Sequence, residues 1–109
     1  AGQHRLNNLT LIVDNNRQQI LGKTKDIVNP EPLTEKHRAF NWQTVSVDGH
    51  NFDELLQAFN QKTEKPKAII ANTIKGKGVS FMENNHAWHS LCPNEKEYEQ
   101  AKKELENAN

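Results

Sequence analysis

Residues 11–22 read "LIVDNNRQQILG" and join an apolar run to two polar patches, residues 14–16 and 17–19, before a turn glycine. The run begins at Leu9, so residues 9–13 have the short, nearly continuous apolar pattern of a strand that is covered on both faces. The polar end of this strand has two interpretations. It could be a plain corner, since Asp and Asn often end strands. It could also be a polar cluster held at the carboxyl end of a strand to bind a ligand.

The rest of the chain alternates strand and helix patterns. Further strands are expected at residues 42–47 and 68–71, and helices at residues 33–40, at residues 52–59 and after Asn94. We expect Thr34 to cap the first helix and Asn51 or Asp53 to cap the second. The core face of the second helix is expected to consist of Phe52, Leu55, Leu56 and Phe59. The alternation predicts an α/β fold: a three-layer α/β/α fragment with a short, mostly parallel sheet, in one domain over residues 1–109.

Composition limits the classes of function. The chain has 109 residues, with 14 basic and 14 acidic side chains, which argues against nucleic acid or a membrane surface as partner. No apolar run approaches the roughly 18 residues of a membrane span. A single cysteine excludes an internal disulfide framework, and a reduced, cytoplasmic setting is expected. The hydrophobic share is only 34%, so we expect some apolar surface to meet another chain or segment.

Three polar segments could carry chemistry. Residues 14–16 offer oxygen atoms, which Mg²⁺ prefers as ligands. Residues 73–78, "TIKGKG", could bring two lysines to an anion, or form a flexible loop with solvated lysines; the spacing does not fit a Walker A loop. His86 and His89 have no third ligand nearby in the sequence, so metal binding by this pair is not expected.

Four stretches in this order resemble the thiamine-diphosphate-binding domain of transketolase, most closely the N-terminal subunit of split transketolases. They are "NNLTLIVDNNRQQILG", "EPLTEKHRAFNWQTVSVDGHNFDELLQAF", "TIKGKGVSFMEN" and "WHSLCPNEKEYEQA". By this resemblance, residues 1–109 are the C-terminal part of that domain. The resemblance implies a dimeric transferase of the pentose phosphate pathway, which uses thiamine diphosphate and Mg²⁺ to transfer a ketol unit between sugar phosphates.

The resemblance also implies a set of site residues. The metal ligands would be the Asn16 side chain and the Gln18 backbone carbonyl. Ile20 would contact the rings of the cofactor, Lys75 would lie near the cofactor, and His89 near its diphosphate. Asp14 is then not a ligand, and no residue of this chain is assigned a catalytic role.

Departures from the family pattern limit the expected activity. The Gly-Asp-Gly half of the family's metal site would lie upstream of Leu9, and the activating Glu comes from a second subunit or domain. We therefore expect the isolated chain to be inactive, not to retain thiamine diphosphate or Mg²⁺, and to work in a homo- or hetero-oligomer. Ser90 and Leu21 replace a Gly and an Asp of the family. The alternative is a stand-alone, non-catalytic remnant that acts as a binding or oligomerisation module through an exposed sheet edge.

Overall fold

The computed structural model describes residues 1–107, so residues 108 and 109 of the expected domain lie outside the described residues. The chain forms two compact units. The first contains residues 1–15 and 29–73, and the second contains residues 16–28 and the chain from residue 74 onward. No helix in the described part of the chain combines the length and the apolar character needed to cross a bilayer.

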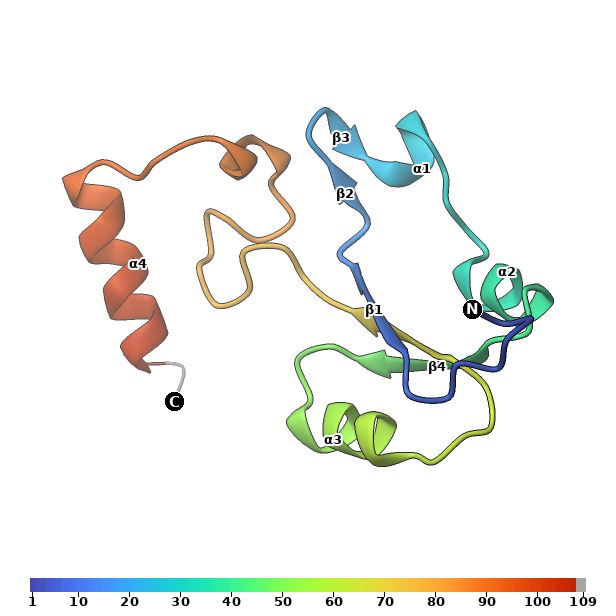
Figure 1. The fold of residues 1–109 in the computed structure, drawn as a ribbon. Coiled ribbons are helices and arrows are strands. Elements are labelled where there is room, and N and C mark those ends of the chain that lie inside the picture. Colours follow the sequence, from blue (N-terminus) through green and yellow to red (C-terminus); the bar gives the residue numbers. More distant parts are fainter. Residues whose placement is uncertain (108–109) are drawn as a thin grey trace. The chain divides into compact units, whose positions relative to one another are not determined.

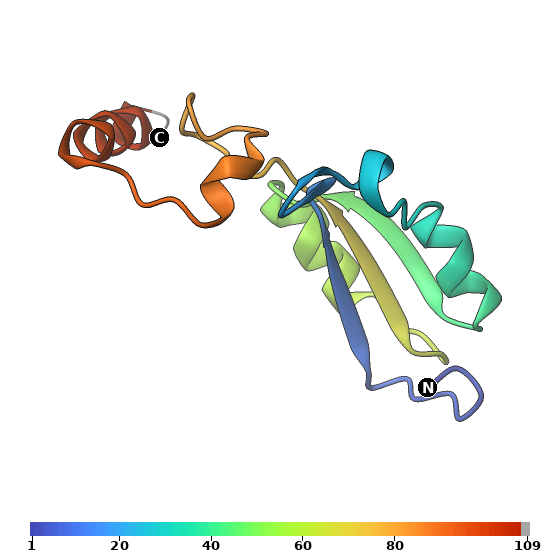
Figure 2. The same ribbon diagram turned by 90° about the horizontal axis from the view of Figure 1, so that it is seen from above.

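The first unit is built on a three-stranded parallel sheet in the order β1-β5-β4, with β1 at Thr10–Asn15, β4 at Gln43–Asp48 and β5 at Lys67–Asn72. Parallel neighbours need crossover connections, which here contain α2 (Leu33–Ala39) and α3 (Phe52–Asn60). These helices lie on opposite faces of the sheet (Figure 1), and the strands run side by side (Figure 2). The predicted α/β class with a mostly parallel sheet is confirmed.

The core lies where α3 covers β4 and β5. Its buried cluster is Val47, Ala58, Ile69 and Ala71, with Val45 and Leu55 packed against it. The predicted core face of α3 is therefore wrong in part, because Phe52 is 80% exposed and Leu56 and Phe59 also face outward. On α3, Ala58 is buried in this cluster and Leu55 packs against it, while both Phe side chains stay exposed.

Strand β1 differs from the expectation in length and in cover. It continues through Asp14 to Asn15, and Ile12 is 50% exposed where burial on both faces was expected. Asn15 is buried, and its Nδ2 donates to Glu31 Oε1 at 3.1 Å and to Asn72 Oδ1 at 3.2 Å. The polar residues Asp14 and Asn15 therefore belong to β1 itself, so the strand does not end in a plain turn at residue 14.

The helix starts confirm one predicted cap and correct another. The Asn51 side chain accepts hydrogen bonds from the backbone N–H groups of Asp53 and Glu54, so Asn51 caps α3 and Asp53 does not. Thr34 does not cap α2, because this helix already begins at Leu33. The N–H of Leu33 instead donates to the Glu31 carboxylate at 2.9 Å. A carboxylate two residues upstream replaces the expected hydroxyl cap.

The second unit contains short elements and one longer helix. They are β2 (Gln18–Gln19), β3 (Gly22–Lys23), α1 (Thr24–Ile27), the 3₁₀ helix η1 (His86–His89) and α4 (Glu95–Asn107). Asn94 begins α4 as predicted: its side chain accepts from the N–H of Glu97, whose carboxylate accepts from the N–H of Asn94.

Lys67, at the start of β5, is a buried cation that closes the end of α3. Its exposed fraction is only 4%, and its Nζ donates to the carbonyl oxygens of Ala58 and Phe59, each at 2.8 Å. Carbonyls at a helix C-terminus have no partners within the helix, so a cation there satisfies them and opposes the negative end of the helix dipole.

Lys67→Met should lower the free energy of unfolding by about 1–3 kcal/mol, because it keeps the aliphatic stem but leaves two carbonyls without their donor. Denaturant unfolding measures the change. Exposed Lys65 provides a matched control, and Lys65→Met should stay within about 0.5 kcal/mol of the parent. Equal unfolding midpoints for the two variants would contradict this role of Lys67.

Candidate functional site

The first half of the site is a small hairpin at residues 16–28. Asn16 Oδ1 accepts a hydrogen bond from the N–H of Gln18 at 2.9 Å, which forms an Asx turn at the start of β2. β2 then pairs antiparallel with β3 around a tight turn at Ile20 and Leu21. Gly22 ends this turn with φ +143°, a conformation that other residues rarely adopt. The hairpin therefore fixes the Asn16 amide and the Gln18 backbone beside each other.

The second half is a compact loop at residues 75–84. The N–H of Asn84 donates to the Lys75 carbonyl at 2.9 Å and closes the loop. Inside it, Gly76 has φ +73°, and a Cβ at that position would lie 2.6 Å from the Met82 carbonyl oxygen. Position 76 therefore requires a glycine for two reasons: the backbone is left-handed there, and Met82 approaches it closely. The loop holds the backbone of Lys75 in one place.

A third segment, η1, carries His89. The indole Nε1 of Trp88 donates to the Phe81 carbonyl at 3.0 Å, and the two aromatic rings lie 5.3 Å apart between centroids. Asn85 begins η1, and its side chain accepts from the N–H of Ala87. These contacts connect η1 to the loop that starts at Lys75.

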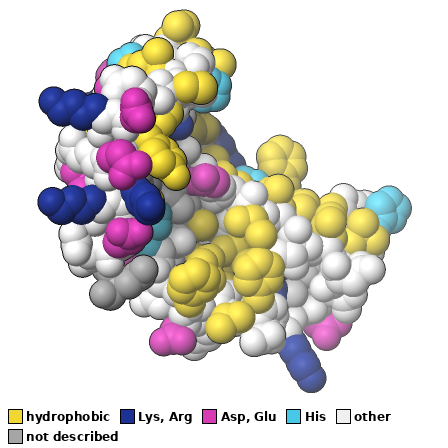
Figure 3. Space-filling view, turned by 90° about the vertical axis from the view of Figure 1, so that its left-hand side faces the viewer, with side chains coloured by type: hydrophobic (Ala, Val, Ile, Leu, Met, Phe, Trp, Pro, Cys, Tyr) yellow, Lys and Arg dark blue, Asp and Glu magenta, His cyan; other side chains and the backbone are white. Residues whose placement is uncertain are grey.

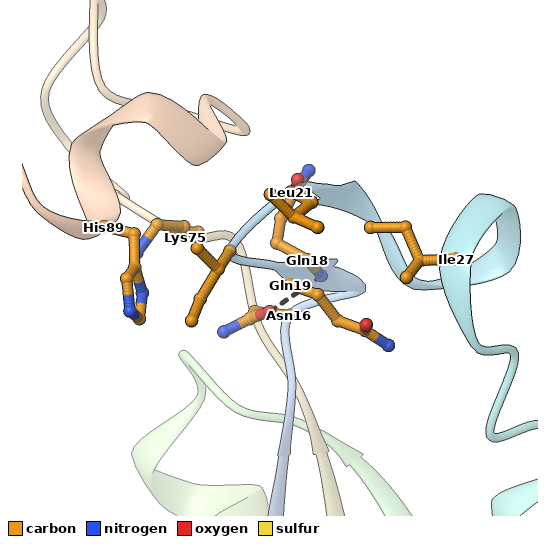
Figure 4. A pocket seen from close by; sticks show the side chains of 8 residues that line it. Asn16, Gln18, Gln19, Leu21, Ile27, Lys75 and His89 are labelled. Atoms are coloured by element: carbon orange, nitrogen blue, oxygen red, sulfur yellow. Dashed lines mark hydrogen bonds between the residues drawn. The ribbon is translucent and has the colours of Figure 1, made fainter.

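These three segments enclose a pocket of about 680 Å³ within the second unit. Its lining residues are Asn16, Gln18, Gln19, Ile20, Leu21, Ile27, Lys75 and His89. In Figure 4, Lys75 and His89 lie on one side of the pocket next to Asn16, and Ile27 lies on the opposite side. The structure therefore brings together all five residues that the family resemblance implied for metal and cofactor binding, although they are up to 73 positions apart (89 − 16).

The lining has the chemistry of a site for an anion bound together with a hard cation. Asn16 and Gln18 carry neutral oxygens in their amide and backbone carbonyl groups, and neutral oxygens suit Mg²⁺. Lys75 and His89 offer N–H donors, which suit phosphate oxygens. Ile20, Leu21 and Ile27 form an apolar wall, as an organic ring system requires.

The lining includes no Asp or Glu, so its oxygen ligands for a cation are all neutral. Asp14 is not part of it; its carboxylate accepts a hydrogen bond from the Thr73 hydroxyl. Within residues 1–107, no group of three or more His, Cys, Asp and Glu side chains is placed to hold a metal ion.

Sequence reasoning missed several features of this site. Leu21 and Ile27 were not predicted to line a pocket, and the Gln18 side chain was not assigned a contact. That side chain donates from Nε2 to the Asn84 carbonyl at 3.3 Å. Asn84 has φ +55°, and the only sequence signal was that Asn adopts this region more readily than most residues.

The loop that follows Lys75 is also held to α4. The N–H and the hydroxyl of Ser80 donate to the Glu104 carboxylate at 2.6 and 2.8 Å, and the Gln100 side chain donates to it at 2.8 Å. These hydrogen bonds, that of Gln100 first, lower the pKa of Glu104 below its ordinary value. Because the pKa of Glu104 is lowered, this contact stabilises the second unit fully when the pH is above the ordinary pKa of a Glu side chain. The stabilisation is lost as the pH falls through the lowered pKa of Glu104.

Proteins that are similar to this chain in sequence and in fold point to one family. Residues 1–108 match the family described as "Transketolase, thiamine diphosphate binding domain". The chain is 45% identical over 109 residues to the 6-deoxy-6-sulfo-D-fructose transketolase subunit SqwG of Clostridium sp. (strain MSTE9), with 97% of this chain and 40% of the relative covered. It is 35% identical over 108 residues to an apulose-4-phosphate transketolase subunit from Phocaeicola vulgatus, with 96% and 38% covered.

Solved structures agree with the sequence relatives. Transketolase from Campylobacter jejuni superposes with a TM-score of 0.90 at 32% identity, with 97% of this chain and 17% of that chain covered. The chain thus spans well under half the length of these proteins. On the match over residues 1–108, this chain belongs to the transketolase thiamine diphosphate-binding domain family.

Proposed function

We propose that this chain supplies one part of the thiamine diphosphate and Mg²⁺ site of a transketolase that moves a two-carbon ketol unit between sugar phosphates. The observation that carries the proposal is the convergence of Asn16, Gln18, Ile20, Lys75 and His89 on one pocket. Thiamine diphosphate, when bound, supplies the carbon centre that holds the transferred unit. The protein's own contribution is to bind this cofactor and to orient it.

Each side of the pocket has a proposed task. The Asn16 side chain and the Gln18 carbonyl bind Mg²⁺, while Lys75 and His89 donate to the diphosphate oxygens. Ile20 packs against the cofactor's rings. Lys75 and the metal ion would offset the negative charge of the diphosphate, and His89 would add a hydrogen bond to it.

The proposed metal site is incomplete within residues 1–107, the part that the structure describes. Mg²⁺ bound with a diphosphate is usually held by one or two carboxylates as well, and the pocket lining offers none. We infer that a carboxylate from another segment completes the site, and that the activating Glu comes from a second subunit or domain. The names of the two sequence relatives support this, since both are described as subunits of a transketolase.

Calorimetry with thiamine diphosphate and Mg²⁺ tests the proposal. The complete protein with its partner subunit should bind the cofactor saturably and only in the presence of Mg²⁺. The 109-residue chain alone should show no micromolar binding. Absence of binding by the complete protein would contradict the proposed function, whereas micromolar binding by the short chain would contradict only the incomplete metal site.

A non-catalytic module that self-associates is the second candidate, and exposed apolar residues in the first unit favour it. Phe52, Leu56 and Phe59 are exposed on α3, and Ile12 is exposed on the edge strand β1. Hydrophobic side chains gather visibly on the molecular surface (Figure 3). Surfaces of this kind commonly meet a partner. Light scattering of the isolated chain decides: a monomer at high concentration would exclude pairing with a second copy.

A further inference from the structure

Asn84 connects the two loops that form the pocket, and both of its peptide groups take part. Its N–H donates to the Lys75 carbonyl at 2.9 Å, and its own carbonyl accepts from Gln18 Nε2 at 3.3 Å. Asn84 is thus bonded to the loop that carries the cationic side of the pocket and to the hairpin that carries the oxygen side.

We propose that Asn84 and the Gln18 side chain are positioning residues, which hold the metal ligands at a fixed distance from Lys75. This inference rests on the proposed function, since it concerns the same thiamine diphosphate and Mg²⁺ site. Neither residue needs to contact the diphosphate for this role. Their task is to fix the spacing between the two sides of the pocket.

The backbone of Asn84 makes this connection possible. With φ +55° the residue is left-handed, which directs its N–H into the loop of residues 75–84 and its carbonyl toward the hairpin. Asn and Gly adopt this conformation readily, while a β-branched residue does so only with strain. The conformation, and not the amide group of the side chain, therefore carries the connection.

Gln18 makes two hydrogen bonds that anchor the start of the hairpin. Its N–H donates to Asn16 Oδ1 at 2.9 Å, while its side chain reaches Asn84. Both hydrogen bonds are made by Gln18 itself, so they hold in place the residue whose carbonyl is proposed as a metal ligand. Loss of the side-chain bond would leave the Asx turn intact but free the hairpin from the loop of Lys75.

The test measures Mg²⁺-dependent thiamine diphosphate binding by the complete protein in three variants. Gln18→Met removes the donor and keeps the length of the side chain, and Asn84→Val disfavours the left-handed backbone. Each should weaken binding by about 3- to 10-fold, the loss expected for one hydrogen bond. Asn84→Gly keeps both peptide groups and the left-handed conformation, so it should bind much more tightly than Asn84→Val.

A matched control separates positioning from general stability. Asn41, in the first unit, is also left-handed, with φ +63° and a side-chain bond to the Gly2 carbonyl. Asn41→Val should lower the thermal midpoint of the ligand-free protein without changing the Mg²⁺ concentration needed for cofactor binding. Gln18→Met and Asn84→Val should raise that Mg²⁺ concentration. Their effects should not add in the double variant, because both break the same connection.

Each result has one meaning. Tight binding by Gln18→Met and Asn84→Val, fully additive losses, or an equal loss in Asn41→Val would overturn the positioning role while leaving the proposed function standing. No binding by the wild-type protein would overturn the proposed function, and the positioning role with it.

Discussion

Asn16→Ala is expected to weaken Mg²⁺-dependent thiamine diphosphate binding by about 100-fold or more in the complete protein. Residues that only support metal ligands typically contribute about 10- to 100-fold to metal affinity, and Asn16 is proposed as a ligand itself. The substitution also removes the acceptor for the N–H of Gln18, so the second proposed ligand loses its fixed position. Calorimetry at several Mg²⁺ concentrations measures the loss.

Asn16→Asp is the informative companion variant. It keeps an oxygen that can accept from the N–H of Gln18 and provides a carboxylate, which Mg²⁺ prefers. Binding should therefore be far tighter than in Asn16→Ala. Unchanged affinity in Asn16→Ala would mean that the metal ligands have been assigned to the wrong segment.

Gly76→Ala should open the loop of residues 75–84. The left-handed backbone alone costs about 1–2 kcal/mol for a residue with a Cβ. The added methyl group would also lie 2.6 Å from the Met82 carbonyl oxygen and 2.8 Å from its Cβ, so the loop must move. Hydrogen exchange at the Asn84 amide, which donates to Lys75, should become faster, and cofactor binding should weaken.

Gly22→Ala separates the two causes. Gly22 also has a positive φ, at +143°, but an added Cβ would meet only Ile27 Cδ1, at 3.8 Å. This variant should be strained without a clash and should leave the Asn84 amide protected. If that amide exchanges at the wild-type rate in Gly76→Ala as well, the close packing of Met82 is not what holds the loop closed.

The order of the three sheet strands and of α2, α3 and α4 was readable from the sequence because its signals are local, whereas the short elements β2, β3, α1 and η1 were not predicted. Apolar runs marked β1 and β5, and an alternating pattern marked β4. Asn94, and Asn51 or Asp53, marked two helix starts because such side chains favour the N-cap position. The core-facing side of α3 could not be predicted from the sequence, since apolar residues occur on both sides of this helix. Only the packing of the folded chain shows that Ala58 is buried and Phe52 is exposed. Glu31 was missed as the partner of α2 because its carboxylate lies outside the usual cap position.

The candidate site could not be assembled from local patterns. Asn16, Lys75 and His89 are far apart in the chain, and only the family resemblance placed them together before the structure did so. Their proposed roles remain predictions. The Gln18 side chain and Asn84 were missed because their bond depends on the approach of two loops, and no spacing in the sequence encodes such an approach.

The central position of β5 also has a consequence during synthesis. β1 emerges from the ribosome 57 residues before β5, which is its only strand partner among the described residues. β4 also precedes β5 and pairs with it. Contacts between residues so distant in sequence form slowly, because a long loop must close first. The segment "TLIV" of β1 is therefore an unpaired apolar strand in the nascent chain, and a chaperone that shields it until residue 72 has been made would prevent aggregation.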